Sequence, residues 1–98
     1  MSAIDEVVAR ATAGLASLEQ TLGELSALRG RATDPSGLVT VEVDEQGGLI
    51  DLRIPESLRD VDARELGRAV VATAARAAAT VAERRDRILA SLHDRLND

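Results

Sequence analysis

The side chains best suited to catalysis or metal binding are few in this sequence of 98 residues. His93 is the single histidine, and cysteine is absent. A metal site or a catalytic triad needs partners for this histidine, and neither a second histidine nor a thiolate exists to serve as one. The serines also lack the glycine pattern of a nucleophile elbow. We therefore expect no enzyme activity, no metal and no cofactor, and we interpret His93 as a solvated residue on a helix surface.

Gly47 and Gly48 are the best candidates for a phosphate-binding loop. A loop of that kind leads directly into a helix and supplies a lysine, whereas here an alternating, strand-like run follows and the chain has no lysine. We interpret the pair as part of a hairpin turn. The neighbouring Asp44 and Glu45 are then solvated turn residues and not a cation site.

Arginine supplies all 12 basic side chains, and it is densest at Arg84, Arg85 and Arg87. Arg29 and Arg31 form a second group. On an exposed helix, such arginines either pair with carboxylates one turn away, for roughly 0.2–0.5 kcal/mol per pair, or contact phosphates. The carboxylates available for pairing in the first group are Glu83, Asp86 and Asp94. Both interpretations remain open on the sequence alone.

The composition restricts both the partners and the core. A net charge of −5 argues against a nucleic-acid binder that relies on overall charge, although an acidic chain can still carry a local basic patch. The chain has no aromatic residue, so its core must consist of Leu, Ile, Val and Ala. A small aliphatic core buries limited area, which favours self-association. We expect no small-molecule substrate.

The elements that must position these side chains centre on the only segment with β-type patterning. Residues 38–43 and 49–54 alternate between apolar and polar side chains on either side of a polar stretch that contains two glycines. This pattern predicts an antiparallel β-hairpin. Residues 31–37 before it are rich in turn formers, and the first few of them are able to form a short additional edge strand.

The two faces of the predicted hairpin differ in polarity. The apolar face consists of Val39, Val41, Val43, Ile50, Leu52 and Ile54. A one-residue shift of the pairing would bury Asp51, so Val41 must lie opposite Ile50 or Leu52. A lone hairpin is only marginally stable, and its apolar face therefore needs helices or a second sheet against it.

A long helix is predicted over residues 2–29, before the hairpin. Ser2 and Asp5 resemble a capping box at its start. Apolar residues then recur at alternating steps of four and three, which is the pattern of a coiled-coil-like helix. This heptad seam consists of Ile4, Val8, Ala11, Leu15, Leu18, Leu22 and Leu25. The seam either packs on the hairpin or is shared with another chain.

A second long helix is predicted over residues 62–96, where Asp62 and Glu65 form a stronger capping box. One apolar stripe runs along it, and in its first two-thirds further small and aliphatic residues widen that stripe. The stripe consists of Leu66, Val70, Ala74, Ala77, Val81, Ile88 and Leu92, and the widening residues are Val71, Ala75, Ala78, Ala82 and Leu89. The alanine-rich part suits close approach to another helix.

Element lengths predict an extended molecule that forms a dimer. The helices would span roughly 40 Å and 50 Å, whereas a six-residue strand spans only about 20 Å. Both helices of this single small domain must therefore project beyond the sheet. Their apolar stripes need cover, either from each other or from a second copy, and we expect a homodimer.

The sequence also indicates where the protein works. The first residues lack a basic segment followed by an apolar run, so we expect no signal peptide. No apolar run approaches the length that spans a membrane. We therefore expect a cytoplasmic protein without a membrane partner.

The hairpin resembles that of the YbaB/EbfC family of small nucleoid-associated proteins. The resemblance begins with the residues Gly-Leu-Val-Thr-Val at 37–41, Gly47 or Gly48, and Leu-Ile-Asp-Leu-Arg-Ile at 49–54. It continues through Asp-Ala-Arg-Glu-Leu at 62–66 and the alanine-spaced helix that follows. The order of helix, hairpin and helix extends it to essentially the whole chain. Arg-Ala-Thr-Asp at 31–34 is similar to the variant common in high-GC Gram-positive members.

The resemblance implies an α+β dimer joined through its sheets, with projecting helices, that binds duplex DNA with little sequence preference. For that function we expect the DNA contacts to come from Arg84, Arg85, Arg87, Arg10 and Arg29. The dimer contacts and core would be formed by Val39, Val41, Ile50, Leu52, Leu18 and Leu22. Some relatives of this fold are linked to type VII secretion, so the alternative is a protein-interaction or accessory module that binds a helical partner and no DNA.

Overall fold

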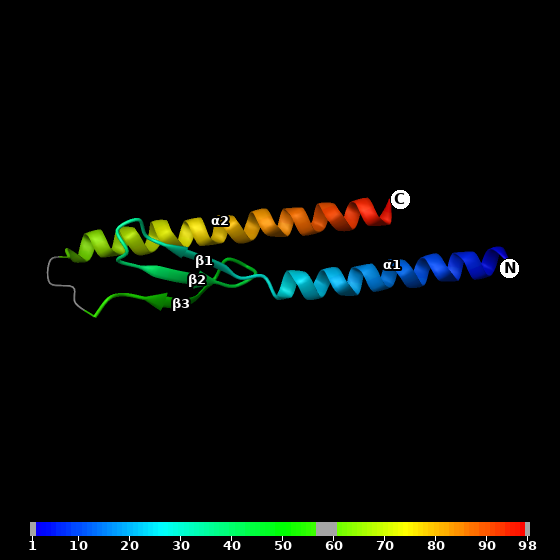
Figure 1. Cartoon of the computed structure of the whole chain (residues 1–98), viewed down its shortest axis with the longest axis horizontal. Helices are drawn as coiled ribbons and strands as arrows, with labels where there is room; N and C mark the ends of the chain where they lie inside the picture. The colour runs from blue at the N-terminus through cyan, green and yellow to red at the C-terminus, as the bar shows by residue number, and fades with distance from the viewer. Residues whose placement is uncertain (1, 57–60, 98) are drawn as a thin grey trace.

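The chain consists of a long helix, a three-stranded sheet and a second long helix, in that order (Figure 1). The computed structural model describes residues 2–56 and 61–97. Its elements are α1 (Ala3–Ser26), β1 (Gly30–Thr33), β2 (Thr40–Val43), β3 (Leu49–Arg53) and α2 (Ala63–Leu96). The predicted α+β fold is confirmed, and β1 is the additional edge strand. The first helix ends three residues before the predicted boundary, and both hairpin strands are slightly shorter than predicted.

Side-chain caps set where both helices begin. The hydroxyl oxygen of Ser2 accepts a hydrogen bond from the backbone N–H of Asp5 at 3.3 Å. At the second helix, Asp62 Oδ1 accepts one from the N–H of Arg64, also at 3.3 Å. Each cap satisfies a backbone donor that lacks a partner within the first helical turn. The polar residues recognised in the sequence as helix starts therefore act as N-caps.

The sheet is antiparallel throughout, in the order β1-β2-β3. Val41 pairs with Leu52, which is one of the two registers predicted. The pairing then shifts, because Glu42 faces Asp51 whereas Val43 faces Leu49. One residue of β3 is therefore inserted opposite β2, which is the geometry of a β-bulge.

The turn between β2 and β3 is held by the side chain of Asp44. Its Oδ1 accepts hydrogen bonds from the N–H groups of Gln46 at 2.9 Å and Gly48 at 2.8 Å. Gly47 has a φ of 83°, which a residue with a Cβ rarely adopts. Asp44 therefore orders this turn, which is a structural role beyond that of a solvated turn residue.

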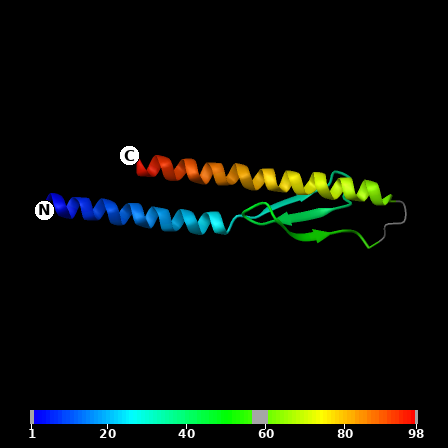
Figure 2. The ribbon, with the colours of Figure 1, turned by 180° about the vertical axis from the view of Figure 1, so that it is seen from behind.

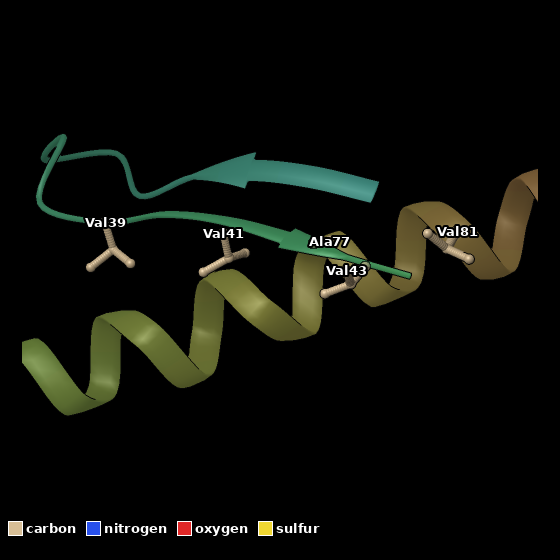
Figure 3. Packing of buried hydrophobic residues seen from close by; sticks show 5 residues of the cluster. All are labelled: Val39, Val41, Val43, Ala77 and Val81. Atoms are coloured by element: carbon tan, nitrogen blue, oxygen red, sulfur yellow. The ribbon is translucent and has the colours of Figure 1, made fainter. Parts of the chain in front are cut away.

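The core lies where α2 packs across β1 and β2 (Figure 3). Its fully buried apolar residues are Val39, Val41, Val43, Ala77 and Val81. The predicted apolar stripe of α2 is buried or half-buried at each of its seven positions, so the stripe is confirmed. Three of the residues expected to widen it, Val71, Ala75 and Leu89, are instead exposed.

The third strand has no helix over it. An α-helix is about 10 Å wide and strands lie about 4.8 Å apart, so a single helix covers roughly two strands. In β3 and just after it, Leu49, Ile50, Leu52 and Ile54 are each between 36% and 49% exposed. Half of the predicted apolar face therefore has no cover within the chain.

The molecule measures 74 × 18 × 15 Å, because both helices project beyond the sheet as expected. The second half of α2 runs alongside α1, and the two chain ends lie at the same end of the molecule (Figures 1 and 2). The helices meet along a stripe of small residues in α1, Gly14, Ser17 and Thr21.

Most of the heptad seam of α1 lies away from this stripe, whereas its last residue, Leu25, follows Thr21 by four positions and is half-buried. Leu15, Leu18 and Leu22 are 57%, 43% and 64% exposed. The seam does not pack on the hairpin, so that alternative from the sequence is wrong. Its sharing with another chain stays a prediction.

Candidate nucleic-acid interface

Where α1 leads into β1, one arginine of the α1–β1 connection lies close to two arginines of α2. Arg29 Nη1 lies 3.1 Å from Glu45 Oε2, in an ion pair between the α1–β1 connection and the β2–β3 turn. Arg84 Nη1 donates to the carbonyl oxygen of Arg29 at 3.0 Å. Arg85 Nη1 donates to the carbonyl oxygen of Glu45 at 3.5 Å. We call Arg29, Arg84 and Arg85, together with Glu45, the junction cluster.

The junction cluster connects α2 to both loops at this end of the sheet. The side chains of Arg29 and Glu45 are 47% and 36% exposed, so their ion pair is solvated and contributes at most about 1 kcal/mol. A solvated pair of this strength exchanges partners easily. The arginines therefore have a structural role, and Arg29 and Arg84, which are exposed, remain accessible to an anion.

Arg87 lies on α2 close to the junction cluster in sequence, and it is exposed. Within residues 2–56 and 61–97, no ion pair involves its side chain. Arg87 follows Arg85 by two residues and takes no part in the hydrogen bonds of the junction cluster.

Arg10 lies far from the cluster, toward the free end of α1. It lines a hollow between α1 and α2 together with Arg95, which the sequence reasoning did not single out. Arg95 Nη2 donates to Thr21 Oγ1 at 3.2 Å. The sequence signal that could have found Arg95 is its spacing of eleven residues from Arg84, which is three helical turns and places both on one face of α2.

The residues predicted for the dimer contact or the core separate into two groups. Val39 and Val41 are buried beneath α2. Ile50, Leu52, Leu18 and Leu22 are exposed. The first two therefore serve the core of one chain, and the other four form apolar surface.

A second hollow, of about 380 Å³, lies where the β1–β2 connection meets the start of α2. Asp34, Glu65 and Arg68 are its charged lining residues. The hydrogen bond from the Ser36 hydroxyl holds the pKa of the Asp34 carboxyl below its usual 3.8. Asp34 is therefore an anion at neutral pH, and this hollow carries two carboxylates against one guanidinium.

Metal binding and membrane insertion find no support in the parts of the chain that are described. Over residues 2–56 and 61–97, no three histidine or acidic side chains gather closely enough to hold a metal ion. In the same ranges, neither helix combines the length and the apolar character that crossing a membrane requires.

Comparison with protein-family models relates the chain to a known family. A search of curated proteins finds none that matches the chain. The model of the YbaB/EbfC DNA-binding family matches residues 1–96, which is nearly the full length. The match covers both helices, the sheet and the junction cluster, and the chain therefore belongs to the YbaB/EbfC DNA-binding family.

Proposed function

We propose that this protein is nucleoid-associated and binds duplex DNA as a homodimer, with little sequence preference, through arginine contacts to phosphates. The observation that carries the proposal is the junction cluster, in which Arg29 lies beside Arg84 and Arg85, more than 50 positions away in sequence. Phosphate contacts position a protein on DNA but read no bases, so this chemistry fits binding to any sequence.

The acidic total charge is compatible with this proposal because the charges are distributed unevenly. The cluster presents three arginines beside a single carboxylate, Glu45. A phosphate that displaces Glu45 would gain charge-assisted hydrogen bonds, which are about twice as strong as neutral ones. Arg87 and Arg10 would add phosphate contacts of the same kind, because each carries a guanidinium group whose donors match phosphate oxygens.

The homodimer supplies cover for the exposed apolar strand. β3 is an edge strand, and Leu49, Ile50, Leu52 and Ile54 expose their side chains along it. The opposite face of the sheet is polar, with Arg31, Glu42 and Asp51 aligned across the three strands. A second copy placed against β3 buries the same residues from each subunit, as a two-fold interface requires. Leu18 and Leu22 of the heptad seam would join this contact.

Fluorescence anisotropy of a labelled mixed-sequence duplex tests the proposal directly. We expect the native protein to bind, and its affinity to fall log-linearly with salt as counterions are released. Reversing Arg84 and Arg85 to Glu should abolish binding to every duplex alike. The matched control reverses Arg64 and Arg68, which lie at the other end of α2.

Two outcomes would contradict the proposal. Absence of binding at low salt would remove DNA as the partner and favour the alternative of a protein-interaction module. Loss of binding in the Arg64 and Arg68 control to the same extent would show that overall charge, and not the junction cluster, determines affinity. Circular dichroism of each variant checks that the helices are intact, because Arg84 and Arg85 also hold the fold together.

A further inference from the structure

We infer that the hollow between α1 and α2 is a second phosphate site, built by Arg10 and Arg95. The hollow has a volume of about 290 Å³. Its lining residues are Arg10, Ala13, Gly14, Ser17, Arg95 and Leu96. Water occupies about 30 Å³ per molecule in the liquid, so a phosphate group fits there with part of its hydration shell.

The charges of the lining favour an anion. Arg10 and Arg95 come from different helices, and among residues 2–56 and 61–97 no carboxylate lines the hollow. Arg95 is held in place by its hydrogen bond to Thr21 Oγ1 at 3.2 Å, which leaves its other donors available. Ser17 adds a hydroxyl donor to the same wall. Guanidinium groups are well suited to phosphate because their planar fork offers paired donors.

Gly14 and Leu96 line the hollow from opposite helices. A Cβ placed on Gly14 would lie 3.8 Å from Leu96 Cδ2, in ordinary van der Waals contact, so a methyl group at this position would fit beside Leu96. Leu96 therefore forms an apolar side of the hollow, and the two arginines supply its charge.

The hollow between the β1–β2 connection and the start of α2 differs from this one in the charge of its lining. It also contains an arginine, Arg68, but Asp34 and Glu65 share its lining. Carboxylates would repel a phosphate and neutralise the guanidinium. The hollow at Arg10 and Arg95 is therefore the better phosphate site of the two.

The hollow and the junction cluster lie along one face of α2. Along α2, Arg84 and Arg95 share one face and lie roughly 16 Å apart. The hollow thus extends the row of phosphate contacts that begins at the junction cluster.

This inference rests on the proposed function for its source of phosphate, a DNA backbone, and the experiment separates the two. Duplex binding is measured by anisotropy for Arg10→Gln/Arg95→Gln and for the charge-matched control Arg64→Gln/Arg68→Gln. In parallel, the amide resonances of Gly14 and Ser17 are followed by heteronuclear NMR as inorganic phosphate or duplex is added. Circular dichroism confirms that both double variants fold.

We expect Arg10→Gln/Arg95→Gln to bind duplex about tenfold more weakly at 0.1 M salt, with a salt slope smaller by about one. The control should change little, and the Gly14 and Ser17 resonances should shift with either ligand in the native protein.

Equal affinities for the two double variants would overturn the phosphate site while the proposed function stands. If the native protein binds no duplex but inorganic phosphate still shifts Gly14 and Ser17, the proposed function fails and the hollow is a site for a free phosphorylated ligand. Unchanged resonances with both ligands, together with no duplex binding, would overturn both.

Discussion

Glu45 contributes the one carboxylate of the junction cluster, where it occupies a donor of Arg29. Its Oε2 lies 3.1 Å from Arg29 Nη1, the kind of contact a phosphate oxygen would make. Arg85 hydrogen-bonds its backbone carbonyl, so the turn stays attached even when the carboxylate moves. The Glu45 side chain therefore competes with phosphate for Arg29.

Replacing Glu45 with Gln should strengthen duplex binding by about 1.4- to fivefold, because a solvated ion pair is worth roughly 0.2–1 kcal/mol. Anisotropy at fixed salt measures the change. Glu42→Gln makes the same change of charge on the polar face of the sheet and should have a smaller effect. In an Arg29→Gln background the benefit of Glu45→Gln should disappear, since neighbouring residues couple. An equal gain from both Gln variants would argue against competition at Arg29.

At the scale of elements, Gly30 explains how β1 packs against α2. The residue is buried at the start of the strand. A Cβ placed there would lie 2.5 Å from the carbonyl oxygen of Ala77 and 2.7 Å from Val81 Cγ2. Only a residue without a side chain allows this approach, and the chain must leave α1 before Gly30 to place it there.

Gly30→Ala should lower the free energy of unfolding by about 1–3 kcal/mol, as overpacking in a core does. Thermal or urea unfolding followed by circular dichroism measures the loss. Gly23→Ala is a matched control, because a Cβ on Gly23 meets no atom within 4 Å. Its position inside α1 predicts a gain of up to about 1 kcal/mol from helix propensity. A neutral Gly30→Ala would show that β1 can move away from α2 without cost.

At the scale of the whole molecule, the distribution of uncovered apolar surface determines how copies can associate. β3 and the heptad seam expose aliphatic side chains, whereas the sheet face turned away from α2 is polar. Burial of apolar area contributes about 25 cal/mol per Å², so these surfaces favour association. The arginines of the junction cluster take no part in this apolar surface.

Leu52→Asp should shift the protein from dimer to monomer in sedimentation velocity, because it places a charge in the proposed contact at β3. Thr33→Asp adds the same charge on β1, at the opposite edge of the sheet, and should leave the dimer intact. A dimer that survives Leu52→Asp but dissociates with Thr33→Asp would place the contact at β1 instead. Circular dichroism separates dissociation from unfolding.

Local patterns in the sequence determined the elements and their local partners. Alternation restricted the partner of Val41 to Ile50 or Leu52, because a one-residue shift would bury a charge, and the structure has Leu52 there. Ser2 and Asp62 identified the two helix starts, because each short polar side chain satisfies a backbone donor in the first turn. These features depend on residues close to each other in the chain, and the sequence displays them directly.

Only the tertiary structure decided which face of each helix meets which partner. α1 faces α2 through Gly14, Ser17 and Thr21, because small side chains allow close approach, and its leucine seam is left uncovered. Hydropathy alone favours the opposite choice. The contact of Arg84 with Arg29 joins residues 55 positions apart, and that of Arg95 with Thr21 joins residues 74 apart. Contacts at such separations follow from the packing of whole elements, and no local pattern of the sequence records them.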